Sequence, residues 1–187
     1  MDAGNLDIND AVAAFAHTAI GGGLSPLATQ LIEQAGLLRE QPAQALALLH
    51  QAQAAAPRHP APLIALYRFY FYGHQLDEAR AVAESALAIA RTALGPCFGD
   101  QPPSDDDARH NAAVRFYLFT LKGLAYLSLR LSDVEAAQLW MGELRRLDPQ
   151  DRVGGALLAH VLARHLSSDP ASDEALDYPV RGWGSTP

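Results

Sequence analysis

The feature that most constrains the fold is a 34-residue period in the amino-acid sequence. Two segments carry small or apolar residues exactly one period apart: Ala45, Leu49 and Ala52 in the first, and Ala79, Ala83 and Ala86 in the second. After an interruption, segment 131–149 repeats the internal spacing with Ala137, Met141 and Leu144. A period of this length is typical of stacked supersecondary units, each of which buries its apolar face against a neighbour.

The composition favours helices as the units that repeat. Ala and Leu carry the apolar share of the chain, and these side chains lose little rotamer freedom in a helix. Gly73 is placed to end one helix, and Ser132 or Asp133 to cap another. We expect an all-α protein with helices over 8–19, 25–39, 42–56, 60–73, 76–93, 108–130, 133–147 and 151–166.

The three periodic segments resemble the second helix of the tetratricopeptide repeat (TPR), in which a small residue lets two antiparallel helices approach closely. Pro57 and Pro149 stand where that repeat closes with proline. The first helices match less well, since Tyr67 occupies a place where a small residue is usual. The resemblance implies a right-handed α-α superhelix of about three TPR-like helix pairs, with an added N-terminal helix and a C-terminal capping helix. An unrelated helical bundle stays open as the alternative.

The resemblance also implies a division of the chain. We expect one helical repeat domain over 1–166 and an irregular tail over 167–187. Within the domain we expect repeats over about 26–58, 60–93 and 113–150, a surface loop over 95–107, and a capping helix over 151–166. The loop contains glycine, paired prolines and the acidic run 105–107, which is expected near the N-terminus of the next helix because the helix dipole favours negative charge there.

The charge and the apolar runs exclude several classes of protein. The net charge of −7 would repel the phosphate backbone, so nucleic-acid binding is not expected. The N-terminus opens with acids instead of the basic region of a signal peptide, and no run of eighteen apolar residues occurs. Cys97 is the only cysteine, which suits a reducing compartment. We therefore expect a cytoplasmic protein with no membrane partner.

The sequence offers no motif for catalysis. None of its seven histidines pairs with another at the i, i+4 spacing that places two imidazoles on one helical face. It contains neither a G-x-S-x-G nucleophile motif nor a phosphate-binding glycine loop. Cys97 lies in a Gly/Pro-rich segment and is expected to be an incidental thiol. We expect no enzyme activity, no cofactor, and no catalytic or metal-ligating residues.

The expected site is the concave face that a stacked array forms from its first helices. The repeat positions that face such a groove are occupied here by a mixed basic and aromatic set: Gln30, Gln34, Ile64, Arg68, Phe71, Tyr72, Phe119, Lys122, Tyr126 and Arg130. Aromatic rings give contact area at low entropy cost, and Arg or Lys can fix a carboxylate. The alternative is that the rings pack against neighbouring helices and Arg68 only extends along an apolar surface.

The function that this face implies is a non-catalytic adaptor that binds a peptide or protein segment. Arg68→Ala and Lys122→Ala are then expected to weaken partner binding and to leave thermal unfolding nearly unchanged. Segments such as HPAPLIALYRFYFYGHQLDEA are also similar to small repeat proteins found among bacterial nitrogen-fixation genes. That similarity implies help in assembling a larger enzyme system such as nitrogenase. The alternatives are a self-associating structural protein, such as a homodimer, and a small enzyme or metal carrier.

Overall fold

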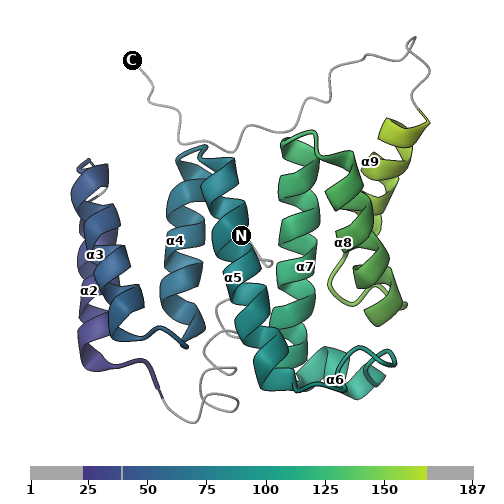
Figure 1. Ribbon diagram of the computed structural model, residues 1–187, viewed down its shortest axis with the longest axis horizontal. Coiled ribbons are helices and arrows are strands. Elements are labelled where there is room, and N and C mark those ends of the chain that lie inside the picture. The colour runs from purple at the N-terminus through teal and green to yellow at the C-terminus, as the bar shows by residue number, and fades with distance from the viewer. Residues whose placement is uncertain (1–22, 39, 168–187) are drawn as a thin grey trace.

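The described part of the protein is all-helical. The computed structural model describes residues 23–38 and 40–167. Within these ranges it contains eight helices and no strand. In the labels of Figure 1, the helices are α2 (Pro26–Leu37), α3 (Pro42–Ala55), α4 (Pro60–Tyr72), α5 (Leu76–Leu94), α6 (Asp105–His110), α7 (Ala112–Arg130), α8 (Val134–Leu147) and α9 (Ala156–Leu166). The all-α prediction is confirmed for these residues.

The local sequence explains where the helices start. Three of them begin with a proline in the first turn: Pro26, Pro42 and Pro60. Proline suits this place because its fixed φ is helical and its missing N–H would have no intrahelical partner. Asp133 caps α8 by accepting from the Ala136 N–H at 3.1 Å. Gly73 follows the last residue of α4 as predicted.

The helices form three pairs that stand side by side along the molecule: α2 with α3, α4 with α5, and α7 with α8 (Figure 1). Successive pairs touch through α3 and α4 and through α5 and α7, while α9 packs on α8 and α7. Equivalent turns connect the two helices of the second pair and the two helices of the third pair. In each, one residue adopts a left-handed conformation, His74 with φ 58° and Ser132 with φ 59°. The backbone N–H of the following residue then donates to the carbonyl that lies five residues before it.

The periodic residues form the seams within and between these pairs. All nine are at most 4% exposed: Ala45, Leu49, Ala52, Ala79, Ala83, Ala86, Ala137, Met141 and Leu144. The largest core cluster surrounds α7, where Phe116, Leu118 and Leu121 are almost fully buried. Smaller clusters join α2 to α3 and α3 to α4. The period therefore reports which helical faces are buried.

The segment predicted as a loop over 95–107 is partly helical, and that prediction is wrong at its end. Helix α6 begins at Asp105, with Ser104 as its cap, because the Ser104 hydroxyl accepts from the Asp107 N–H at 3.0 Å. The helix predicted over 108–130 is also interrupted at Asn111. The side chain of Asn111 accepts from the backbone N–H groups of Ala113 and Val114, so it ends α6 and caps α7.

The remainder of this connection is held against the helices. Arg91 donates to the carbonyl of Phe98, and Arg146 donates to the carbonyl of Gly99. The Phe98 ring meets the Tyr117 ring edge-on at 5.1 Å between centroids. The extra residues between the second and third pairs therefore pack on α5, α7 and α8.

The C-terminal helix is shorter than predicted. It was expected over 151–166, but α9 begins at Ala156 because the preceding turn places Asp151 and Gly154 at positive φ. The Asp148 carboxylate accepts from the Arg152 and Val153 N–H groups at 2.9 Å each and fixes this turn. The helix predicted over 8–19 and the tail from residue 168 onward lie outside the described residues. None of the described helices is long and apolar enough to cross a membrane.

Candidate functional site

An aromatic groove opens between α4, α5 and α7, with a volume of about 200 Å³. We use "aromatic groove" for the cavity lined by Leu63, Ile64, Tyr67, Arg68, Phe71, Tyr72, Ala83, Ala86, Phe116, Phe119, Thr120 and Gly123. The α4 and α7 residues form its walls, and two alanines of α5 form part of its lining. Most of this lining is apolar, so removing it from water by covering it with a ligand would be favourable in free energy.

Helical spacing places the lining residues of each wall on one face of its own helix. On α4, Ile64, Arg68 and Phe71 follow one another at four and three residues and therefore lie on one face. On α7, Phe119 and Gly123 are four residues apart. Gly123 leaves the wall open, because a Cβ atom at this position would lie 3.6 Å from the Tyr67 hydroxyl, at ordinary contact distance.

The rings of α4 form a connected group. Phe71 stacks on Tyr67 at 5.7 Å between centroids and meets Tyr72 edge-on at 5.5 Å. Phe71 also lies 5.9 Å from Tyr126 of α7, so the group bridges the two walls. Burial raises the pKa of Tyr67 to about 12, with the nearby hydroxyls of Tyr126 and Tyr72 adding to the shift. The Tyr67 hydroxyl is therefore neutral and can only donate or accept hydrogen bonds.

Arginines accompany the rings. Arg68 belongs to the lining of the groove. The guanidinium of Arg115 lies over the Phe119 ring at 5.4 Å, and that of Arg130 lies over the Tyr126 ring at 5.8 Å. Arg130 also donates to the Tyr126 hydroxyl at 2.9 Å. The arrangement can therefore present positive charge beside an apolar cavity.

The structure brings together half of the residues predicted from the sequence. Five line the aromatic groove: Ile64, Arg68, Phe71, Tyr72 and Phe119. Tyr126 and Arg130 lie beside it, through the contact between Tyr126 and Phe71. Gln30 and Gln34 are exposed on α2 and belong to a different part of the surface. The packing alternative is true in part, because Phe71, Phe119 and Tyr126 are half-buried against neighbouring helices.

Lys122 has a different place from the one predicted. Its ammonium donates to the Val153 carbonyl at 2.7 Å, in the turn before α9. Burial lowers the pKa of Lys122, an effect that the nearby Asp151 carboxylate opposes. Lys122 therefore joins α7 to the turn before α9 and does not line the aromatic groove. The prediction of a groove-facing cation is wrong at this position, because the sequence does not show that Val153 lies within reach.

Sequence reasoning missed the deeper part of the groove. The unpredicted lining residues are Leu63, Tyr67, Ala83, Ala86, Phe116, Thr120 and Gly123. One signal was present: Tyr67 stands where the resembling repeat has a small residue. A large ring at that place has to lie between helices, and here it forms part of the wall between α4 and α7.

The cysteine and the acidic run lie outside the lining of the aromatic groove. Within 23–38 and 40–167, no three His, Cys, Asp or Glu side chains gather so that they could hold a metal ion. Cys97 is exposed. The acidic run Asp105, Asp106 and Asp107 forms the first turn of α6, as predicted, where Asp105 pairs with Arg109 at 2.9 Å and with Arg152 at 2.6 Å.

Over the described residues, fold and groove together define an all-helical protein with an apolar cavity between helix pairs and an arginine in its lining. The chain is 37% identical over 126 residues to an uncharacterized 19.8 kDa protein in the nifW 5′ region of Azotobacter chroococcum mcd 1. The match covers 63% of this chain and 68% of that relative. The chain therefore belongs to the same family as this nifW-region protein. No protein-family model matches the chain. No solved structure matches it either.

Proposed function

We propose that this protein is a non-catalytic adaptor that binds a segment of another protein in the aromatic groove. The observation that carries the proposal is the groove itself: an apolar cavity of about 200 Å³ whose walls come from two different helix pairs. Tyr72 is 68% exposed at its edge although it is a large ring. Exposed rings beside an apolar pocket are the features that protein partners use as anchors.

We propose that the helix pairs form a right-handed superhelix of the TPR type. The support is the equivalence of the three pairs, in which residues at equal spacing are buried and two of the connecting turns have the same hydrogen bonds. In such an array the first helices α2, α4 and α7 line the concave face. The walls of the aromatic groove come from two of these first helices, α4 and α7, with two alanines of α5 also in its lining; repeat proteins bind partners on such a face.

We propose further that the adaptor acts in the assembly of a larger enzyme system such as nitrogenase. The support is the position of the relative in a nifW 5′ region, together with a fold and groove suited to binding another protein. A protein that assists assembly needs to hold a partner segment without chemistry. The lining of the groove provides contact area and hydrogen-bond donors for that task.

A blocked groove tests this function. Gly123→Leu places a large side chain in the cavity beside Tyr67, whereas Gly123→Ala adds one methyl group at ordinary contact distance. Affinity capture from the source cells, grown with and without fixed nitrogen, should retain a common partner on the wild type and on Gly123→Ala but not on Gly123→Leu. A partner retained equally by all three proteins would contradict binding in the groove. A partner present only under fixed nitrogen would contradict the assembly role.

Self-association is a second candidate, favoured by a separate surface. Leu27 and Leu37 of α2 are 59% and 84% exposed. These residues lie ten apart on α2, on the same side as Gln30 and Gln34. A dimer that buries this side should dissociate in Leu27→Ser/Leu37→Ser. Light scattering of the wild type across concentration gives the answer, because a monomer at all concentrations would exclude this candidate.

A further inference from the structure

The chain enters the described structure beside the start of α4. Gly23, the first described residue, lines one cavity together with Arg58 and His59, which immediately precede that helix. Figure 1 shows that α2, α4 and α7 all start at the same end of the molecule. The 22 residues that precede Gly23 in the sequence are therefore attached next to the starting end of the first helices.

The aromatic groove begins close to that end. On α4 its lining runs from Leu63, nearly one turn after the start of the helix at Pro60, to Tyr72, the last residue of the helix. At a rise of about 1.5 Å per residue, this stretch of α4 is roughly 14 Å long. A helix of three turns attached at the starting end of α4 can therefore cover the whole lining.

The preceding segment has the pattern of an amphipathic helix. Within the helix predicted over 8–19, apolar residues recur at spacings of four, three and four and therefore share one side: Ile8, Val12, Phe15 and Ala19. We call these four residues the apolar stripe. Asp10 and His17 fall on the opposite side of the same helix. A helix of this length is about 18 Å long, which is enough to cover the lining on α4.

The connection between the predicted helix and α2 is short and rich in glycine. Residues 20–23 read IGGG, and glycine adopts turn conformations that other residues avoid. Four residues span at most about 14 Å, so the end of the predicted helix stays near the start of α4. The helix then lies antiparallel to α4, with Ala19 towards Leu63 and Ile8 towards Tyr72.

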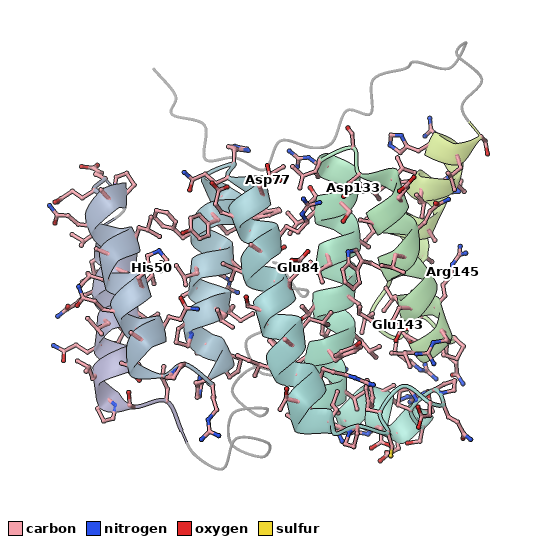
Figure 2. The ribbon with its side chains drawn as sticks, in the orientation of Figure 1. His50, Asp77, Glu84, Asp133, Glu143 and Arg145 are labelled. Carbon is pink, nitrogen blue, oxygen red and sulfur yellow. The ribbon has the colours of Figure 1, made fainter. Side chains whose placement is uncertain are left out.

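The apolar lining of the groove suits the apolar stripe better than the side formed by the second helices. In Figure 2 the labelled Glu84 and Arg145 belong to α5 and α8, and both are exposed. The groove instead offers apolar side chains such as Leu63 and Phe116. Covering apolar surface is favourable, whereas covering charged groups costs their hydration.

The exposed side of α2 is a poorer match for the stripe. Its exposed leucines, Leu27 and Leu37, are separated by the exposed side chains of Gln30 and Gln34. The groove has a continuous lining and a volume of about 200 Å³. That volume lies below the roughly 300 Å³ at which pockets for small molecules begin, and it suits one large side chain of a longer ligand.

We propose that segment 8–19 of this chain docks as a helix in the aromatic groove, with Phe15 in the cavity and the apolar stripe against α4 and α7. The regulatory consequence rests on the proposed adaptor function, because the segment then competes with the partner for one lining. A short connection gives the segment an effective concentration on the order of millimolar. A partner has to displace it, so the segment sets the affinity at which the adaptor is occupied.

Photo-cross-linking in the full-length protein tests this inference. Phe15→benzoylphenylalanine places the photoreactive group on the apolar stripe, and His17→benzoylphenylalanine places the same group on the opposite side. After irradiation of dilute protein, the first variant should give cross-links within one chain to lining residues of α4 or α7, located by mass spectrometry. The second variant should give these cross-links in much lower yield.

Three changes, each added to the Phe15→benzoylphenylalanine protein, tie the cross-links to the groove. Gly123→Leu occupies the cavity and should abolish them, whereas Gly123→Ala adds one methyl group at ordinary contact distance and should keep them. Ile8→Ser/Val12→Ser should also abolish them, and it leaves every described residue unchanged. Thermal unfolding of each protein shows whether the fold is intact.

Three results would overturn the docked segment. Cross-links to α2 or to the exposed sides of α5 and α8 would place the segment elsewhere. Equal yields from the two photoreactive positions would show that the apolar stripe does not choose the contact. Cross-links between two chains would assign the groove to the segment of a second copy.

Affinity capture separates this inference from the adaptor function. Val12→Ser/Phe15→Ser should release the groove and retain more of the groove-dependent partner than the wild type does. Cross-links to the groove without any captured partner would support the docked segment and contradict the adaptor function. A groove-dependent partner without such cross-links would support the adaptor function and contradict the docked segment.

Discussion

At the scale of single residues, small side chains and caps decide where helices meet. Gly123 and Gly155 both lack a Cβ atom, but the absence of that atom has a different effect at each position. A Cβ atom at Gly123 would meet only the Tyr67 hydroxyl at 3.6 Å. At Gly155 it would lie 2.8 Å from Cδ2 of Leu144, a side chain that is 2% exposed. Gly123 keeps a cavity open, whereas Gly155 allows the turn before α9 to pack on α8.

Alanine at the two glycines should therefore have opposite effects. Gly123→Ala should raise the free energy of unfolding by about 0.5–1 kcal/mol, because alanine has the higher helix propensity and meets no clash. Gly155→Ala should lower it by roughly 1–3 kcal/mol, because Leu144 has to move within a packed core. Urea unfolding of both variants measures the two values. A loss of stability at Gly123 would show that the groove wall is already packed to its limit.

His59 is a titratable group within a helix cap. It is 8% exposed, and its Nδ1 accepts from the Ala61 N–H at 3.1 Å at the start of α4. An accepting Nδ1 carries no proton, so the proton of the neutral ring is on Nε2, which is buried and has no hydrogen-bond partner among the described residues. Burial lowers the pKa of His59 below 6.5, because the charged ring would be desolvated.

The fold should consequently lose stability in acid through His59. The unfolded chain binds this proton more readily than the folded one, so the contribution is present above about pH 6.5 and falls as the pH drops towards the lower pKa of the folded state. His59→Asn keeps a capping side chain and removes the titration. Urea unfolding of both proteins between pH 8 and pH 5 should show a smaller loss for the variant. Parallel curves would contradict this role.

At the scale of elements, long-range hydrogen bonds fix the position of α9. Lys122 of α7 and Asp148 at the end of α8 both bond to the turn that precedes it, Lys122 through the Val153 carbonyl and Asp148 through two N–H groups. Lys122 is therefore a structural residue. The expectation that Lys122→Ala weakens binding and leaves thermal unfolding nearly unchanged is therefore replaced by an expected loss of stability.

Lys122→Met keeps the aliphatic stem and removes the donor to Val153. We expect it to lower the free energy of unfolding by about 1–2 kcal/mol, because the Val153 carbonyl loses its partner. In this variant, hydrogen exchange at the amides of α9 should be faster than in the wild type, whereas exchange at the amides of α4 should be unchanged. Arg145→Met, at an exposed residue of α8, should stay within about 0.5 kcal/mol of the wild type. Unchanged exchange in α9 would show that the bond does not hold this helix.

At the scale of the whole molecule, the pairs are stacked so that the first pair touches mainly its neighbour. Among the described helices, α2 and α3 make their main contacts with a later helix through α4. The cluster around Leu49 is small, whereas Leu121 lies in the large cluster around α7. In a stacked array, stability is a sum over units and over neighbouring interfaces.

This arrangement predicts local effects at one end. Leu49→Ala and Leu121→Ala each remove a buried side chain and should each cost about 2–5 kcal/mol in the affected unit. Hydrogen exchange resolved by residue should show that Leu49→Ala loosens α2 and α3 and spares α7. Leu121→Ala should loosen α5, α7 and α8 together. Equal loosening of α7 in both variants would indicate a single cooperative bundle in place of a repeat array.

The sequence by itself determined the helical class, the faces that are buried and one wall of the groove. These properties follow from local rules: the helical repeat fixes which side chains share a face, so the places of Leu66, Arg68 and Phe71 on α4 could be worked out from their spacing. Proline marked the start of α2, α3 and α4, and Gly73 marked the end of α4, because both residues act on the local backbone. The TPR type of the superhelix remains a proposal.

Only the tertiary structure decided what each face meets. Lys122 bonds to a carbonyl 31 residues away, Arg146 bonds to one 47 residues away, and Tyr67 forms a wall with α7. Asn111 likewise divides one predicted helix into α6 and α7. Helical spacing gives the direction of a side chain from its own axis. It does not give the neighbour that lies in that direction, because this depends on how separate helices pack.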